Sequence, residues 1–230
     1  LVAPRKTPLR VASKSVRVTG LLRRILDRGG AGFRGLMCFS AEEAEVLAGE
    51  GFDDLLIAYP IHQTDDTDRV ARMTASGKTL HVVADSEASL GRLSEAGVRH
   101  GVRVRVLLCL DMSLQALRGR VFLGVRRSPL REVEDVLAAA RCAEKLPGVT
   151  LGGLMGYEAQ IAGLGDDMPF EKAKNAVKAA IKQASIRDVG ERRSAIVRAR
   201  EKAGLSIPLV NGGGTGSLDT TVPESGVTEV

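Results

Sequence analysis

The sequence contains little of what several classes of protein depend on. It has no Trp, two Tyr and five Phe in 230 residues, so few aromatic rings are present for nucleic-acid bases to stack on. Its three cysteines, Cys38, Cys109 and Cys142, have no close spacing, which excludes a disulfide framework and a CxxC metal site and predicts reduced, buried thiols. No apolar run approaches the roughly 18 to 20 residues that a bilayer span requires, and none near the start resembles a signal peptide. We therefore expect a cytoplasmic protein without a membrane segment.

The charge is basic but does not indicate a nucleic-acid partner. There are 33 Lys and Arg residues against 28 Asp and Glu, which gives a net charge of +5 and an isoelectric point of about 9.3. The basic residues are spread through segments with helical periodicity and are interleaved with acidic ones, as on solvated helix faces. The charge is also compatible with a small anionic ligand held by a few of these residues. We expect a small-molecule substrate and no nucleic acid.

Short apolar runs alternate with helical patterns along the chain. Turn residues and segments with a period of 3.6 separate the runs. Strands that are apolar on both faces and separated by helices predict a parallel sheet covered by helices. An open doubly wound sheet and a closed (β/α)8 barrel of the TIM type both fit this α/β pattern. The runs are residues 9–12, 36–39, 55–58, 80–83, 104–108, 151–155 and 208–210.

The number of runs favours the barrel. Residues 226–230 resemble the start of an eighth strand, so we expect a (β/α)8 barrel that is cut off before or within that strand. Such a chain would leave strand edges unpaired and part of the core uncovered. Ser40 and Glu43 form a capping box that predicts the start of one helix. Ser128 predicts another start, with Pro129 at the first helical position.

Polar residues gather where the predicted strands end, which in a barrel is where the active site is built. Lys14 follows the first run, Tyr157 follows the sixth, and Asn211 opens a glycine-rich segment after the seventh. The other polar residues at strand ends are Ser40, Tyr59, Asp85, Asp111, Arg126, Arg127, Glu158 and Gln160.

The glycine-rich segment predicts an anion site. Its glycines, with Thr215 and Ser217, let backbone N–H groups approach a phosphate, and loops after the seventh and eighth strands of barrels commonly bind phosphate. An ordinary turn is the alternative. A dinucleotide fingerprint is a weaker one, because no apolar helix follows the glycines.

Lys14 is the candidate for covalent chemistry. A lysine at the inner end of a barrel strand is desolvated, which favours the neutral amine that forms a Schiff base. A lysine that extends to solvent from the end of a strand is the alternative. A phosphate site and a strand-end lysine in one barrel are the two groups that pyridoxal 5'-phosphate (PLP) requires.

Five segments of the sequence occur in the order found in one enzyme family. They are LRVASKS (9–15), AEEAEVL (41–47), DDLLIAYP (53–60), GLMGY (153–157) and NGGGTG (211–216), and they resemble fold-type III PLP enzymes. Within that group the chain is most similar to the D-threonine aldolase and D-serine dehydratase branch (amino acid deaminase/aldolase), whose barrel resembles the N-terminal domain of alanine racemase. The resemblance covers essentially the whole chain. It implies that residues 1–230 are an incomplete PLP-binding barrel domain, without the family's C-terminal β domain.

The resemblance also implies roles for individual residues. Lys14 would hold PLP as a Schiff base and act as a base at the substrate Cα, and Tyr157 would pack near the pyridine ring. Arg126 would lie near the phenolic oxygen of the cofactor, with Arg127 as the alternative. A divalent metal would be held by residues of the C-terminal domain that this chain does not contain. The remaining cofactor-binding residues would be Asn211 and the phosphate-binding Gly213, Gly214, Thr215 and Gly216.

The activity that the resemblance implies is that of a PLP-dependent lyase. It would act on D-β-hydroxy amino acids by retro-aldol cleavage or by loss of water, as a homodimer when full length, and we expect the 230 residues by themselves to be inactive. An amino acid racemase of the same fold and a PLP-binding homeostasis protein without turnover are the alternatives. Because fold does not determine function, a barrel that binds a sugar phosphate without PLP is the fallback.

Overall fold

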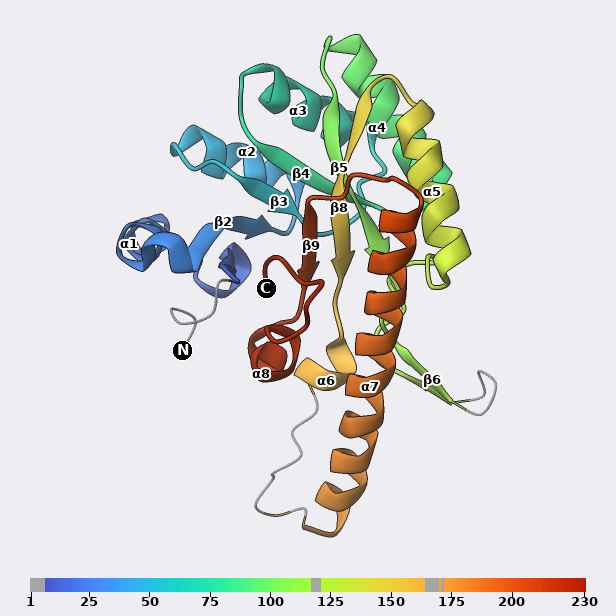
Figure 1. Cartoon of the computed structure of the whole chain (residues 1–230). Coiled ribbons are helices and arrows are strands. Elements are labelled where there is room, and N and C mark those ends of the chain that lie inside the picture. The colour runs from blue at the N-terminus through green and yellow to red at the C-terminus, as the bar shows by residue number, and fades with distance from the viewer. Residues whose placement is uncertain (1–6, 117–120, 164–169, 171) are drawn as a thin grey trace.

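A single sheet of seven parallel strands forms the centre of the molecule (Figure 1). The computed structural model describes residues 7–116, 121–163, 170 and 172–230. The strand order is β1-β2-β3-β4-β5-β8-β9, so each predicted apolar run overlaps one strand and the α/β architecture is confirmed. The strands are β1 (Leu9–Ala12), β2 (Phe33–Cys38), β3 (Leu55–Ile57), β4 (Leu80–Ala84), β5 (Val104–Leu110), β8 (Val149–Gly156) and β9 (Leu209–Gly212).

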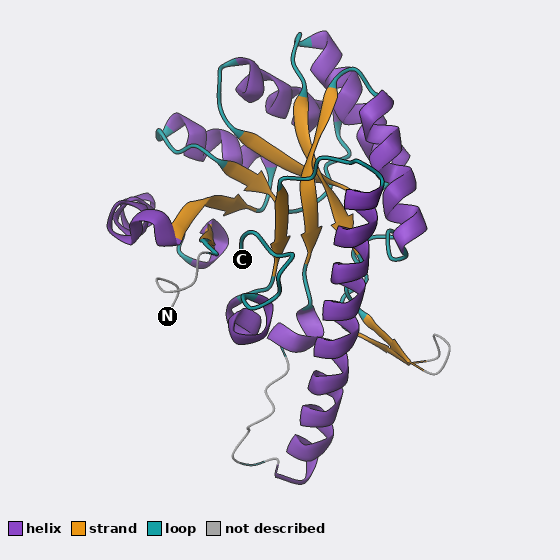
Figure 2. Ribbon diagram, viewed as in Figure 1, coloured by secondary structure: helices purple, strands orange, loops and turns teal. Residues whose placement is uncertain are grey.

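Helices connect the strands and cover the outer face of the sheet (Figure 2). Within the described residues, no helix is both long and apolar enough to cross a membrane. A hairpin of β6 (Leu114–Ala116) and β7 (Val121–Leu123) stands apart from the main sheet and has no counterpart among the predicted runs. The helices are α1 (Thr19–Gly29), α2 (Ala41–Gly49), α3 (Thr64–Ala75), α4 (Glu87–Arg99), α5 (Val133–Lys145), α6 (Ala159–Ala162), α7 (Lys172–Lys202) and α8 (Leu218–Thr221), and the 3-10 turns are η1 (Ser13–Ser15), η2 (Gly30–Gly32) and η3 (Thr215–Ser217).

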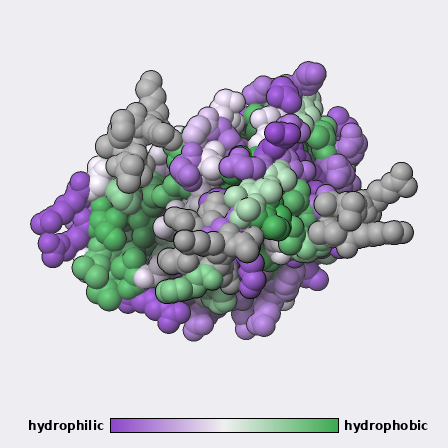
Figure 3. Space-filling view, turned by 90° about the horizontal axis from the view of Figure 1, so that it is seen from below, coloured by the Kyte–Doolittle hydropathy of each residue, from purple (hydrophilic) through white to green (hydrophobic). Residues whose placement is uncertain are grey.

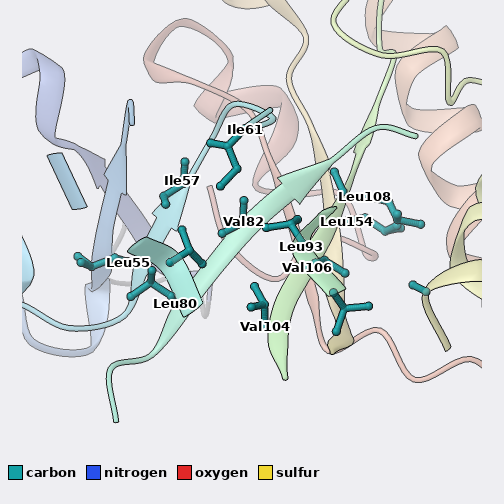
Figure 4. Packing of buried hydrophobic residues seen from close by; sticks show 14 of the residues in the cluster. Leu55, Ile57, Ile61, Leu80, Val82, Leu93, Val104, Val106, Leu108 and Leu154 are labelled. Atoms are coloured by element: carbon teal, nitrogen blue, oxygen red, sulfur yellow. The ribbon is translucent and has the colours of Figure 1, made fainter. Parts of the chain in front are cut away.

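Alternate residues of the strands contribute to two separate cores, as in a barrel whose strands are covered by helices. In β3, Leu55 and Ile57 belong to the large core between the sheet and the helices, whereas Leu56 belongs to a smaller core on the opposite face of the strands. Figure 4 shows part of the large core, with Val82 and Val106 of neighbouring strands close together. The smaller core consists of Leu56, Ala58, Val83, Leu107, Cys109, Met155 and Leu209.

Residues 228–230 lie between the two edge strands of the sheet. The Thr228 amide donates to the carbonyl of Val210 in β9 at 2.9 Å, and the Arg10 amide in β1 donates to the carbonyl of Val230 at 2.7 Å. The Val230 amide donates to the carbonyl of Pro8 at 3.0 Å. The start of an eighth strand is therefore present as predicted, but the expectation that the sheet edges are left unpaired is wrong.

The second predicted helix start is also wrong. Helix α5 begins at Val133 rather than at Pro129. The hydroxyl of Ser128 accepts a hydrogen bond from the Leu130 amide at 3.0 Å, and the carbonyl of Leu130 accepts one from the Asp111 amide at 2.9 Å. Because these bonds tie the segment to the end of β5, the chain reaches its first helical turn only after it has crossed the end of the strand.

The three cysteines are free. Cys38 and Cys109 are buried, as predicted, and burial raises the pKa of these thiols to about 12 and about 11. Cys142 is only partly buried. The two buried thiols therefore act as small apolar residues of the core.

Candidate active site

A cavity of about 350 Å³ lies at the carboxyl ends of the strands, within the size range of small-molecule sites. Residues from β1, β2, β8, β9 and the glycine-rich loop line it. In Figure 1 β8 and β9 run toward the face shown in Figure 3, where hydrophobic surface lies beside hydrophilic surface. The cavity brings together six of the residues predicted from the sequence, and the other two, Arg126 and Gly216, do not line it. The six are Lys14, Tyr157, Asn211, Gly213, Gly214 and Thr215.

Lys14 lies in the turn η1 directly after β1. The hydroxyl of Ser13 shares its one proton between the carbonyl oxygen of Met37 at 2.9 Å and Oε1 of Glu43 at 2.7 Å, which fixes this turn against β2 and α2. The Lys14 side chain is exposed, so the burial predicted for it is not found. The backbone of Lys14 is thus held in place while its amine stays accessible from the cavity.

A second cavity, of about 480 Å³, also includes Lys14 in its wall. It lies against the start of α2, where the hydroxyl of Ser40 accepts a hydrogen bond from the Glu43 amide at 3.1 Å. The Glu43 carboxylate accepts from the amide of Phe39 at 2.6 Å rather than from that of Ser40, so the predicted capping box is only half formed. Phe39 is 57% exposed, which leaves this cavity open to solvent and partly apolar.

Arg127 joins two aromatic rings at the edge of the first cavity. Its guanidinium carbon lies 4.8 Å from the centre of the Tyr157 ring and 5.1 Å from that of Tyr59. Its Nη2 donates to the hydroxyl of Tyr59 at 3.5 Å. Arg126 is exposed and lies outside the cavity. The structure therefore brings Arg127, and not its neighbour, to the other site residues.

The glycine-rich loop is packed too closely for side chains. Gly213 has a φ of +81°, and a Cβ there would lie 2.6 Å from Cγ1 of Val230. A Cβ on Gly214 would lie 2.9 Å from Cε2 of Tyr157, and one on Gly216 would lie 2.0 Å from the carbonyl of Ala162. The absence of side chains at these glycines thus lets the loop backbone pack in close contact with Val230, Tyr157 and Ala162.

Behind this loop lies Glu158, whose side chain is fully buried. Its Oε2 accepts hydrogen bonds from the Gly213 amide at 3.2 Å and from Nη2 of Arg193 at 2.9 Å. Its Oε1 accepts from the hydroxyl of Ser217 at 3.4 Å and from that of Thr221. Glu158 follows the sixth predicted strand, but no sequence pattern gave it a role.

A buried ionic network extends from the cavity wall into the sheet. Arg10 Nε donates to Glu229 at 2.7 Å, and its Nη2 donates to Asp54 at 3.0 Å. Asn211 Nδ2 donates to the same Glu229 at 2.9 Å. The amide nitrogen of this predicted site residue is therefore engaged in the ionic network. Burial, followed by the positive charge of Arg10, lowers the pKa of His81 to about 4.

Arg10 also affects the carboxylate on its other side. Burial by itself raises the pKa of Asp54, but the guanidinium groups of Arg10 and Arg34 outweigh it and hold that pKa below its usual value. Asp54 is therefore ionised at neutral pH. Among the described residues, no group of three or more His, Cys, Asp or Glu side chains is arranged as a metal site.

The fold and the site define a barrel domain with a cavity at the carboxyl ends of its strands. Residues 2–213 match the alanine racemase N-terminal domain family. The chain belongs to this family, and the resemblance based on the sequence motifs is confirmed.

The chain is also similar to several known proteins. It is 28% identical over 193 residues to the 3-hydroxy-D-aspartate aldolase of Paracoccus denitrificans, a match that covers 84% of this chain and 44% of that protein. The D-threonine aldolase of Filomicrobium marinum shares the fold with a TM-score of 0.79 at 20% identity, over 99% of this chain and 55% of that one. For the D-threo-3-hydroxyaspartate dehydratase of Delftia sp. HT23 the TM-score is 0.66 at 23% identity, over 100% and 54% of the two chains. The chain thus spans about half the length of these relatives.

Proposed function

We propose that these residues form the PLP-binding barrel domain of a lyase that acts on D-configured β-hydroxy amino acids. The observation that carries the proposal is the cavity of about 350 Å³, which unites Lys14, Tyr157 and the glycine-rich loop. The relatives support the substrate class, because they are named as aldolases and a dehydratase of D-β-hydroxy amino acids.

The residues around the cavity fit this cofactor. The exposed amine of Lys14 is suited to its aldehyde, and the Arg127 guanidinium to its phenolic oxygen. The glycine-rich loop, which lines the cavity with Gly213, Gly214 and the exposed Thr215, is suited to its phosphate. We assign the phenolic oxygen to Arg127 rather than to Arg126 because only Arg127 lines the cavity.

Each residue then has a task in the reaction. PLP supplies the electron sink that stabilises negative charge at the substrate Cα. Lys14 would hold the cofactor through its amine, and once that amine is released by the amine of the substrate it would be free to exchange a proton with the substrate Cα; its position in the wall of both cavities permits this. Tyr157 packs against the ring of the cofactor, and Arg127 places positive charge beside Tyr157.

The first test is covalent labelling of the chain. PLP is added, the product is reduced with borohydride, and the modified residue is mapped by mass spectrometry. We expect the wild-type chain to carry the pyridoxyl group on Lys14, and the Lys14→Ala variant to carry no pyridoxyl group. A matched control is Lys78→Ala, because Lys78 lies before β4, at the amino ends of the strands, and its loss should leave labelling unchanged. A folded chain that gives no adduct on Lys14 contradicts the proposal.

The second test separates the reactions that this fold supports. On the longest natural form of the protein that contains these residues, an aldolase converts D-threonine into glycine and acetaldehyde, whereas a dehydratase releases ammonia and a 2-oxo acid. An amino acid racemase is the second candidate, because the matching family is named for alanine racemase. It would interconvert D- and L-alanine, and a PLP homeostasis protein would do none of these. A divalent metal, a homodimer and a cytoplasmic location stay predictions from the sequence.

A further inference from the structure

Glu158 ties the glycine-rich loop to three other elements of the fold. It stands directly after β8 and receives hydrogen bonds from Arg193 of α7, from Gly213 of the loop, and from Thr221 of α8. A buried carboxylate is costly unless it is paired and hydrogen-bonded, and this one has an ion pair at 2.9 Å and hydroxyl and amide donors around it. Both of its oxygens are used.

These bonds fix the two ends of the loop. The Gly213 amide bonds to Oε2 of Glu158, and the Ser217 hydroxyl bonds to Oε1. The Ser217 hydroxyl also accepts from the Gly214 amide at 3.1 Å. The first two N–H groups of the loop are therefore engaged within the protein, and the next residue, Thr215, is exposed and lines the cavity.

We propose that Glu158 is a positioning residue that holds this loop in the shape that binds the phosphate of the cofactor, with Arg193 neutralising its charge. The inference rests on the proposed function and deepens it. The negative charge of Glu158 would by itself repel an anion, and the adjacent Arg193 guanidinium offsets that repulsion. Because its hydrogen bonds go to the loop, Glu158 is expected to affect binding of the phosphate group more than binding of the pyridine ring.

The test compares PLP with pyridoxal, which has the same ring and aldehyde but no phosphate. Dissociation constants for both are measured from the visible absorption of the adduct in the wild type and in Glu158→Gln. The glutamine amide nitrogen would face a donor on either side, since Arg193, Gly213, Ser217 and Thr221 all donate to the Glu158 carboxylate. We expect PLP to bind about tenfold more weakly and pyridoxal to change less than about twofold.

Glu224→Gln is the matched control. Glu224 is the other carboxylate on Arg193, at 2.6 Å from Nη1, but its side chain makes no hydrogen bond to the loop among the described residues. We expect both dissociation constants to stay within about twofold of the wild type. If Glu158→Gln fails to fold by circular dichroism, Thr221→Val removes one hydroxyl donor without a change of charge and should weaken PLP binding about threefold, again with pyridoxal unchanged.

Each outcome has a distinct meaning. If the variants bind PLP as the wild type does, or lose PLP and pyridoxal equally, the role of Glu158 is overturned while the proposed function stands. If the wild type binds neither compound, the proposed function fails, and this inference fails with it. Selective loss of PLP binding in Glu158→Gln, with Glu224→Gln unaffected, supports the proposal.

Discussion

The Arg127 guanidinium lies over the rings of two tyrosines from distant parts of the chain. It lies 4.8 Å from the ring centre of Tyr157, which follows β8, and 5.1 Å from that of Tyr59, which follows β3. A cation over an aromatic face is attracted by the electrons of the ring, so the two tyrosines hold Arg127 at the edge of the cavity. This arrangement places one defined positive charge at the site.

Replacement of Arg127 should therefore weaken cofactor binding, whereas replacement of its neighbour should not. We expect Arg127→Gln to raise the dissociation constant for PLP about tenfold, because a hydrogen bond to a charged group is lost. Arg126→Gln is the matched control, since Arg126 is exposed and outside the cavity. The measurement is an absorbance titration with PLP. Equal effects of the two variants would contradict the assignment of Arg127.

Gly213→Ala should destabilise the protein more than the same change at an open site. Gly204 has a φ of +70° with free space around its Cα, so Gly204→Ala should cost only the backbone strain, about 1 to 2 kcal/mol. At Gly213 the contact with Val230 adds an overpacking cost of roughly 1 to 3 kcal/mol. Urea unfolding of the two variants measures the difference. A similar loss at both positions would show that the loop yields to the added methyl group.

The ion pair of Arg10 with Glu229 should be important for stability because both side chains are fully buried. Arg10→Met removes the close charged partner of the buried Glu229 carboxylate, which keeps only the Asn211 amide and Arg34 at 4.0 Å, and we expect the free energy of unfolding to fall by about 3 to 5 kcal/mol. Arg34→Met is the comparison: the Arg34 side chain is 47% exposed, so its pair with Asp54 should contribute only about 0 to 1 kcal/mol. Denaturant unfolding at neutral pH tests both, and a small effect of Arg10→Met would count against the network.

His81 should make the protein less stable in mild acid. Its pKa is about 4 in the folded chain against 6.5 in the unfolded one, so the unfolded chain binds a proton that the folded chain does not. No contribution is expected above about pH 6.5, and stability should fall by about 2 to 3 kcal/mol as the pH drops from about 6.5 to about 4.

The effect of His81 is isolated by substitution. In His81→Gln the slope of unfolding free energy against pH should be smaller over that interval than in the wild type, and His62→Gln, at an exposed position, should keep the wild-type slope. Urea unfolding at about pH 7 and about pH 4.5 measures both slopes. Identical slopes in the wild type and His81→Gln would rule out His81 as the group responsible.

The parts of the fold that the sequence predicted depend on local patterns. Buried parallel strands are apolar on both faces, so runs such as 55–58 stand out against their surroundings. Residues just after such runs, among them Lys14 and Tyr157, were brought together because parallel strands end at one edge of the sheet. The glycine-rich segment could be recognised from the sequence because the close packing of its backbone requires glycines at these positions.

What the sequence did not reveal depends on contacts between distant residues. The choice between Arg126 and Arg127 follows from the path of the chain after the β6–β7 hairpin, which no periodic pattern predicted. Glu158 and Arg193 are 35 positions apart on different elements, so nothing local marks them as partners. Ser128 and Pro129 are typical of a helix start, but the hydrogen bond from the Asp111 amide to the carbonyl of Leu130 holds this segment outside the helix, which begins at Val133.

The segment at residues 228–230 has a consequence for how the protein folds. Its Glu229 meets Arg10 across 219 positions of sequence, and its backbone bridges β1 and β9. Contacts between such remote residues carry a large loop-closure entropy and form slowly compared with local ones. The strands and helices in between are thus expected to assemble first, and the cavity, whose wall includes Val230 and Arg10, to take shape only when the two ends of the sheet meet. Ligand binding would then report on the last stage of folding and not on the formation of the sheet.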